Sequence, residues 1–154
     1  MQTSPQKTFS RKQKGAAAIE FALVFMIFFA VFYGLVSYSL PLLMMQSFNA
    51  ATAEAVRRSV ALSPGIDNYA TVIQTQAQAS LVSQLTWLPP ALKFNAADDA
   101  KVTYNAATGL LTVSINYPKT KLQNVLPSLV LPGIGPVPNL PTYLSAQSSM
   151  QLGN

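Results

Sequence analysis

The most unusual ionisable residue in this sequence is Glu20, which lies at the start of a long apolar run. From Phe21 to Val36 no residue is charged, and only Tyr33 carries a polar side-chain atom. An ionisable side chain well inside a membrane helix costs about 2.5–3.5 kcal/mol on insertion scales, so Glu20 is expected to have a partner. One interpretation is an interfacial carboxylate that reaches the lipid headgroups or pairs with Lys14.

A second interpretation of Glu20 involves cleavage of the chain. If the peptide bond after Gly15 is cut, the new amino group lies on Ala16, near Glu20 of its own chain or of a neighbour. Two opposite charges in lipid would offset each other's desolvation and fix the register of packed helices. The chemistry expected of these residues is therefore ion pairing and not catalysis.

The composition leaves little material for an enzyme. The chain has 154 residues with no cysteine and no histidine, which excludes Ser-His-Asp, Cys-His and thiolate metal sites. The only acids are Glu20, Glu54, Asp67, Asp98 and Asp99. The adjacent pair Asp98-Asp99 supplies too few oxygens for Ca²⁺ and is expected to be a solvated turn. We expect a structural or assembly protein with no cofactor and no bound metal.

The positive charge is concentrated at the N-terminus. Four of the ten basic residues precede position 15, namely Lys7, Arg11, Lys12 and Lys14. The rest of the chain is nearly balanced in charge, with six basic residues and five acids. Nucleic-acid binding would need a basic surface across a folded domain, so no nucleic-acid partner is expected. A basic cluster beside an apolar run instead places the N-terminus in the cytoplasm.

The apolar run from Ala16 to Leu40 is long enough to span a bilayer as a helix, which needs about 20 residues. A secretory signal peptide has a shorter apolar core of about 7–15 residues, followed by a small-residue cleavage site. This run is longer and ends in no such site, so a membrane helix is favoured. Pro41 is expected to interrupt the helix at the outer face of the membrane.

The residues from Lys12 to Phe21 (KQKGAAAIEF) resemble the class III signal sequence of type IV pilin-like proteins. The shared features are a basic leader, a glycine before the cut, a glutamate at mature position five and an aromatic at position six. The whole layout resembles TadE-like minor pseudopilins of the Tad/Flp system. An alanine-rich helix (Asn49 to Arg58) and a C-terminal strand of small residues (Leu144 to Met150) match two further features of that family.

This resemblance implies a domain organisation and a function. Residues 1–15 would be a leader removed by a prepilin peptidase between Gly15 and Ala16, residues 16–40 a transmembrane helix, and residues 41–154 a periplasmic domain. Glu20 and Phe21 would serve assembly. The mature chain would sit in the bacterial inner membrane and join other pilins, pseudopilins and the assembly platform in building a pilus for adhesion, biofilm formation or secretion.

The residues after Pro41 predict an α+β domain. A helix from Leu42 to Leu62 presents the apolar stripe Met44, Phe48, Ala51, Ala55 and Leu62. A second helix is expected from about Asn68 to Leu85, with Asp67 as its N-cap. Alternating residues predict strands at 101–104 and 111–117, joined by a loop that ends at Gly109. A two-stranded hairpin alone is marginal, so a third strand is expected at 143–152. The fold expected is therefore a long membrane helix that continues into an external helix, packed on a three- to four-stranded antiparallel sheet.

The sequence leaves two alternatives open, one for the proline-rich segment and one for the function. The segment from Val125 to Pro141 contains five prolines and no charge, and is either an exposed apolar loop for a partner or a crossover that covers the sheet. We favour the crossover. The alternative to the pilus function is an uncleaved single-span protein whose external domain binds a ligand or senses a signal.

Overall fold

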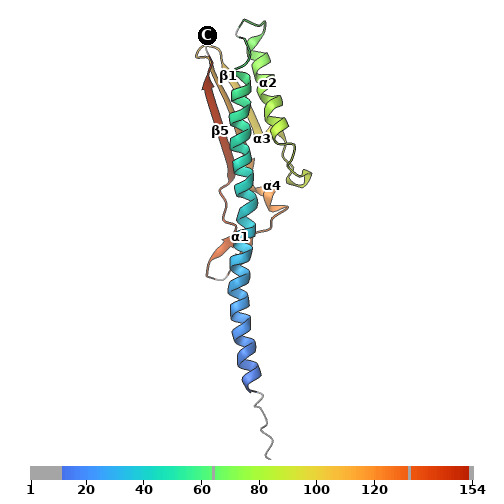
Figure 1. Ribbon diagram of the computed structural model, residues 1–154, viewed down its shortest axis with the longest axis vertical. Coiled ribbons are helices and arrows are strands. Elements are labelled where there is room, and N and C mark those ends of the chain that lie inside the picture. The colour runs from blue at the N-terminus through green and yellow to red at the C-terminus, as the bar shows by residue number, and fades with distance from the viewer. Residues whose placement is uncertain (1–11, 64, 132, 153–154) are drawn as a thin grey trace, which may run out of the picture. The chain divides into compact units, whose positions relative to one another are not determined.

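The computed structural model describes residues 12–63, 65–131 and 133–152 of the chain (Figure 1). The predicted leader therefore lies largely outside the described residues. The chain divides into two compact units, with the boundary after Val36. Helix α1 (Lys12–Ser59) contributes to both units.

In its described residues, the first unit is the N-terminal part of α1. Its large apolar side chains are exposed, as expected of a surface that faces lipid or other helices. Within the described residues, α1 is the one helix that is long and apolar enough to cross a membrane by length and composition. This agrees with the predicted span, because a single lipid-embedded segment must bond its backbone internally as a helix.

The second unit begins with the outer part of α1, which runs through Pro41 without interruption. The expectation that Pro41 breaks the helix is wrong. Pro41, Ser37 and Met44 are all buried in this unit. The buried residues before and after Pro41 therefore hold this segment in a helical conformation, although a proline removes one backbone hydrogen bond of the helix.

The remaining helices and strands follow α1 along the chain. After α1 come helix α2 (Tyr69–Gln84), a 3₁₀ turn η1 (Pro90–Leu92) and the short helix α3 (Ala96–Asp99). Strands β1 (Ala100–Asn105) and β2 (Leu110–Pro118) precede helix α4 (Lys119–Gln123). Strands β3 (Leu129–Leu131), β4 (Gly135–Val137) and β5 (Tyr143–Gln151) complete the chain. The α+β class and the long N-terminal helix are confirmed.

The main sheet is antiparallel with strand order β1-β2-β5. Val102 pairs with Val113, so these two side chains share the inner face, as their alternation predicts. The loop between β1 and β2 turns at Gly109, whose φ of 64° lies in the left-handed region that favours glycine. The outer face is polar and largely exposed, which is usual when one face of an antiparallel sheet meets water.

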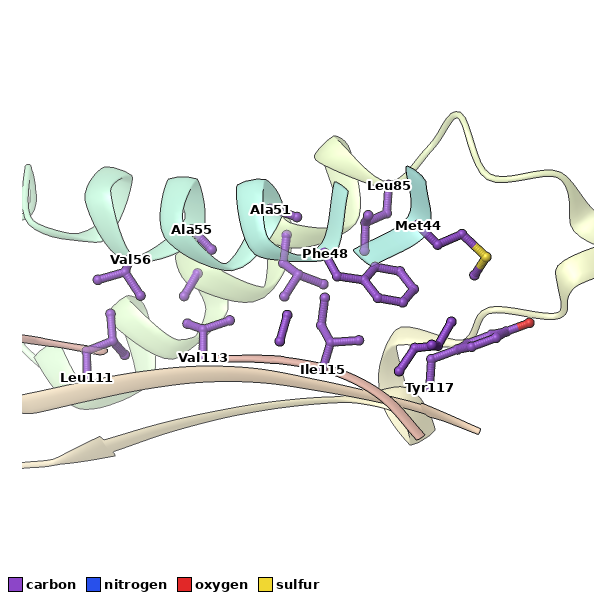
Figure 2. Packing of buried hydrophobic residues seen from close by; sticks show 14 of the residues in the cluster. Met44, Phe48, Ala51, Ala55, Val56, Leu85, Leu111, Val113, Ile115 and Tyr117 are labelled. Carbon is purple, nitrogen blue, oxygen red and sulfur yellow. The ribbon is translucent and has the colours of Figure 1, made fainter. Parts of the chain in front are cut away.

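The core lies between this sheet and helices α1 and α2. Figure 2 shows side chains from α1 pointing toward side chains from β2, with Leu85 beside them. The predicted stripe is confirmed for the four members that lie on α1, which are all buried. Leu62 packs partly buried against the same core but lies after the end of α1 at Ser59, so the helix ends earlier than predicted. The facing layer from β2 consists of Leu111, Val113, Ile115 and Tyr117.

Helix α2 begins one residue later than predicted and has a different cap. Asn68, and not Asp67, occupies the N-cap position, in the left-handed conformation and with no side-chain capping bond. Asparagine tolerates this conformation better than most residues, which explains its place at the turn into the helix. The buried residues Ile73, Ala77 and Leu81 hold α2 on the core.

The proline-rich segment forms a small separate hairpin from β3 and β4. Its roots pack on the domain, because Val137 is buried and Leu126 and Leu140 contact the core. Its tip does not, since Val130 is 77% exposed and Ile134 is 70% exposed. The favoured covering crossover is thus right for the roots and wrong for the tip.

Candidate functional site

The N-terminal junction predicted to be cut lies within α1. Gly15 and Ala16 are both exposed. A Cβ built on Gly15 would meet no atom within 4 Å outside its immediate surroundings in the helix. Packing within the described part of this chain therefore gives no reason for a glycine at this position.

Glu20 lies one helical turn after Ala16 on the same side of α1, since residues four apart are neighbours on a helix. Its side chain is exposed, and it forms no salt bridge with any side chain that the structure describes. The side chain of Lys14, its alternative partner, lies outside the described part. The carboxylate is therefore accessible to a charge from another molecule.

Phe21 begins a row of aromatic rings along α1 that was not among the features predicted from the sequence. Its ring stacks on Phe25 with centroids 6.0 Å apart, and Phe25 stacks on Phe29 at 6.2 Å. Phe29 continues the row to Tyr33 at 6.2 Å. The spacing of four residues was the signal that could have revealed the row. It gives α1 one exposed aromatic surface that starts beside Glu20.

The outer part of α1 is joined to the sheet by a polar contact within the core. The hydroxyl of Thr52 lies 3.0 Å from that of Ser148 on β5, and it also donates to the carbonyl of Asn49. Ala51 and Ala55 pack on this same sheet, whereas Ala50 and Ala53 face away from it. Two of these four alanines therefore pack within this chain, and the other two are exposed.

The outward side of the same helix carries one acid and two bases. Glu54 accepts hydrogen bonds from Arg58 at 2.7 Å and from Arg57 at 2.8 Å. The bond from Arg58, and then that from Arg57, lowers the pKa of Glu54 below its usual value. The predicted pairing of Glu54 with Arg58 is confirmed. Such exposed pairs on a helix contribute little to stability.

The acid pair Asp98-Asp99 is solvated only in part, because Asp98 is exposed as expected and Asp99 is buried. Asp99 is only 4% exposed and accepts a hydrogen bond from the backbone N–H of Asn95 at 2.9 Å. Its two carboxylate oxygens each lie 2.7 Å from Nζ of Lys121. Asp99 and Lys121 are 22 residues apart in the sequence, so they meet only when β2 and α4 are folded in place.

Tyr117 lies next to this ion pair. Its hydroxyl donates to the carbonyl of Leu92 at 2.6 Å, and Nζ of Lys121 lies 5.9 Å from the centre of its ring. Burial, with a smaller effect of the Asp99 charge, raises the pKa of Tyr117 to about 12. Every polar group in this cluster is occupied by a partner within the fold, which indicates a structural role.

A ligand site would need a pocket with convergent polar groups. One open hollow lies between α2 and β1 and has a volume of about 700 Å³. It is lined by Gln74, Thr75, Gln78, Ala79, Val82, Ser83 and Val102, none of which titrates. No group of three or more acids that could hold a metal occurs among the described residues.

The comparisons with known proteins single out the same helix. Residues 15–57 match a family model described as TadE-like protein. This is the family that the N-terminal residues resemble, and the matched segment includes Gly15, Ala16, Glu20 and Phe21. It reaches through the outer part of α1 and ends before the sheet. No curated protein and no solved structure matches the chain.

Proposed function

We propose that this TadE-like chain is a minor pseudopilin, which a prepilin peptidase processes and which takes part in the assembly or initiation of a Tad/Flp type IV pilus. The observation that carries the proposal is the family match over residues 15–57. That segment holds the proposed cleavage junction, the apolar helix and its outer extension in one continuous element.

The peptidase would cut between Gly15 and Ala16 on the cytoplasmic side of the membrane and remove residues 1–15. Both residues are exposed, and a Cβ added at Gly15 would meet no atom of the described chain within 4 Å outside its immediate surroundings in the helix. The new amine on Ala16 would become the first group of the mature helix. Its positive charge is favourable near a carboxylate and unfavourable alone in lipid.

The mature protein would occupy the inner membrane as a single-pass protein. Residues 16–40 would span the bilayer, and residues 41–154 would form the periplasmic domain. The four basic residues before Gly15 support a cytoplasmic N-terminus under the positive-inside rule. Its partners would be the prepilin peptidase, other pilins and pseudopilins of the same system, and the inner-membrane assembly platform.

In the assembly, Glu20 would pair with the amine of Ala16 in the same chain or in a neighbouring subunit. The aromatic row that starts at Phe21 would then pack against the helices of neighbours, because stacked rings present a large apolar contact surface. The ion pair fixes the register of the helices, and the aromatic row supplies the contact area.

The test compares three forms of the full chain in its native host: wild type, Glu20→Ala and Glu20→Asp. We expect Glu20→Ala to be processed normally but to lose most pilus formation, whereas Glu20→Asp keeps the charge and retains part of it. The readouts are the mass of the processed chain and the yield of surface pili. Normal pilus yield from Glu20→Ala would rule out the pairing.

The alternative function, an uncleaved membrane protein that binds an external ligand, predicts a chain that keeps its leader. It would also need a binding pocket, and the hollow between α2 and β1 offers only amide, hydroxyl and aliphatic side chains. No observation favours it over the pseudopilin proposal.

A further inference from the structure

The hairpin of β3 and β4 presents an apolar tip on firmly held roots. Val130 and Ile134 at the tip are 77% and 70% exposed, whereas Val137 at the root is buried. No residue from Gln123 to the C-terminus is charged. Exposing two large aliphatic side chains to water is unfavourable, so this tip is suited to an apolar environment.

The roots of the hairpin are tied to the end of the apolar part of α1. The backbone N–H of Asn139, two residues after β4, donates to the hydroxyl of Tyr38 at 2.8 Å. Tyr38 lies two residues before the end of the run from Ala16 to Leu40. The exposed side chains of Leu42 and Leu43 extend the apolar surface of the helix beyond it.

A lysine lies at the same root. Nζ of Lys119 donates to the carbonyl of Leu140 at 3.2 Å, and its backbone N–H donates to the carbonyl of Thr142 at 3.0 Å. Tyrosine is enriched where membrane helices leave the bilayer, and lysine is favourable beside lipid phosphates. Tyr38 and Lys119 therefore give the base of the hairpin the side chains of a membrane interface.

We infer that the β3–β4 hairpin inserts its tip into the outer interface of the bilayer that α1 spans, with Val130 and Ile134 among the lipid chains and Lys119 at the phosphates. This rests on the membrane placement in the proposed function. A lipid surface fits better than a protein partner, because a stable protein interface needs about 20–30 residues on each side. Two aliphatic side chains on a narrow tip are far below that size, whereas lipid accepts a small wedge.

The other end of the domain provides a matched control. The hairpin roots lie near Pro118 and Tyr143, which pair at one end of the sheet, and the loop that contains Ala107 lies at the opposite end, beside Leu110 and Gln151. The nine residues of β2 separate these ends by about 25–30 Å, at 3.2–3.4 Å per residue. Ala107 is exposed and should stay in water.

The test uses tryptophan fluorescence of the full chain in lipid nanodiscs that hold one copy each. The single native tryptophan is removed as Trp87→Phe, a change at a side chain that is 44% exposed. Ile134→Trp then probes the tip, Ala107→Trp the far loop and Phe28→Trp the membrane helix. Each variant is measured in ordinary phosphatidylcholine and in phosphatidylcholine brominated on its acyl chains, which quenches tryptophan on contact.

We expect brominated lipid to quench the fluorescence of Ile134→Trp and Phe28→Trp strongly and to leave that of Ala107→Trp unchanged. The emission maxima of Ile134→Trp and Phe28→Trp should not lie at the wavelength of water-exposed tryptophan. Quenching of Phe28→Trp without quenching of Ile134→Trp would overturn the inference and leave the membrane span intact. The same variants are also measured in vesicles that hold many copies of the chain. Blue-shifted Ile134→Trp emission that appears only in these vesicles, without quenching by brominated lipid, would also overturn the inference in favour of contact between copies. Failure to quench Phe28→Trp would remove the membrane placement itself and the inference with it.

Discussion

The ammonium group of Lys121 lies 2.7 Å from both carboxylate oxygens of Asp99, which joins helix α4 to the short helix α3. Asp99 is 4% exposed and Lys121 is 25% exposed, so this pair is the most protected of the salt bridges among the described residues. It also borders Tyr117, whose ring belongs to the core layer of β2. The ion pair therefore lies at the edge of the hydrophobic core, next to Tyr117.

Removing Lys121 should leave a buried charge on Asp99 with too few partners. We expect Lys121→Met to lower the free energy of unfolding by about 2 kcal/mol, less than the 3–5 kcal/mol typical of a fully buried pair because Lys121 is partly exposed. The double variant Lys121→Met with Asp99→Leu should recover part of this loss. Denaturant titration of the full chain in detergent measures both, and an unchanged midpoint for Lys121→Met would contradict the account.

Alkaline pH should weaken the fold through Tyr117. Its pKa is raised to about 12 in the fold, against an ordinary value of 10.0, so the neutral phenol is the form that the fold favours. The stabilisation is complete below pH 10 and is lost as the pH rises toward 12. We expect Tyr117→Phe to show a shallower alkaline decline of the melting temperature than wild type. Equal slopes for the two proteins between pH 10 and 12 would refute this.

Phe48 should be the most sensitive apolar position of the outer part of α1. Its ring is fully buried, with centroids 5.9 Å from those of Phe94 and Tyr117. We expect Phe48→Ala to cost about 3–5 kcal/mol, because it removes a large buried side chain and leaves a cavity. Val60→Ala, a change at an exposed position just after the same helix, serves as the control and should cost under about 0.5 kcal/mol.

Strands β1 and β2 could be predicted from the sequence to within one residue at each end, because a half-buried strand alternates with a strict period of two. The end of β5 was also predicted to within one residue, but that strand was expected because a two-stranded hairpin alone is marginal. The buried stripe of α1 was equally readable from its three- to four-residue spacing. The pair of Asp99 and Lys121 could not be predicted. Its residues meet only after β2 and α4 have taken their places, and neither is marked by local sequence.

The candidate site shows a similar division. Glu20 could be identified from the sequence because an ionisable side chain in a membrane helix is unfavourable without a partner. Gly15 could be identified because it stands just before the apolar run, five residues ahead of Glu20. The stacked rings from Phe21 onward were equally visible in the spacing of four but carried no polar atom that drew notice. The exposure of Ile134 depends on how a proline-rich turn folds back, which composition alone does not determine.

Gly15 should matter for processing and not for folding. Because a Cβ added there meets no described atom within 4 Å outside its immediate surroundings in the helix, we expect Gly15→Val to leave the melting temperature of the full chain unchanged. We expect it nevertheless to block removal of residues 1–15. Ala17→Val, a similar change two residues away at an exposed position, is the control for added bulk and should be processed. Normal processing of Gly15→Val would contradict the proposed cleavage site.

The most direct test of the pseudopilin proposal is the intact mass of the protein extracted from the membranes of its native host, with and without the prepilin peptidase. The proposal predicts a shortened chain that begins at Ala16 when the peptidase is present and a chain with its leader when it is absent. A chain that keeps its leader in both strains would contradict the proposal and would leave a signal-anchored domain that is never processed.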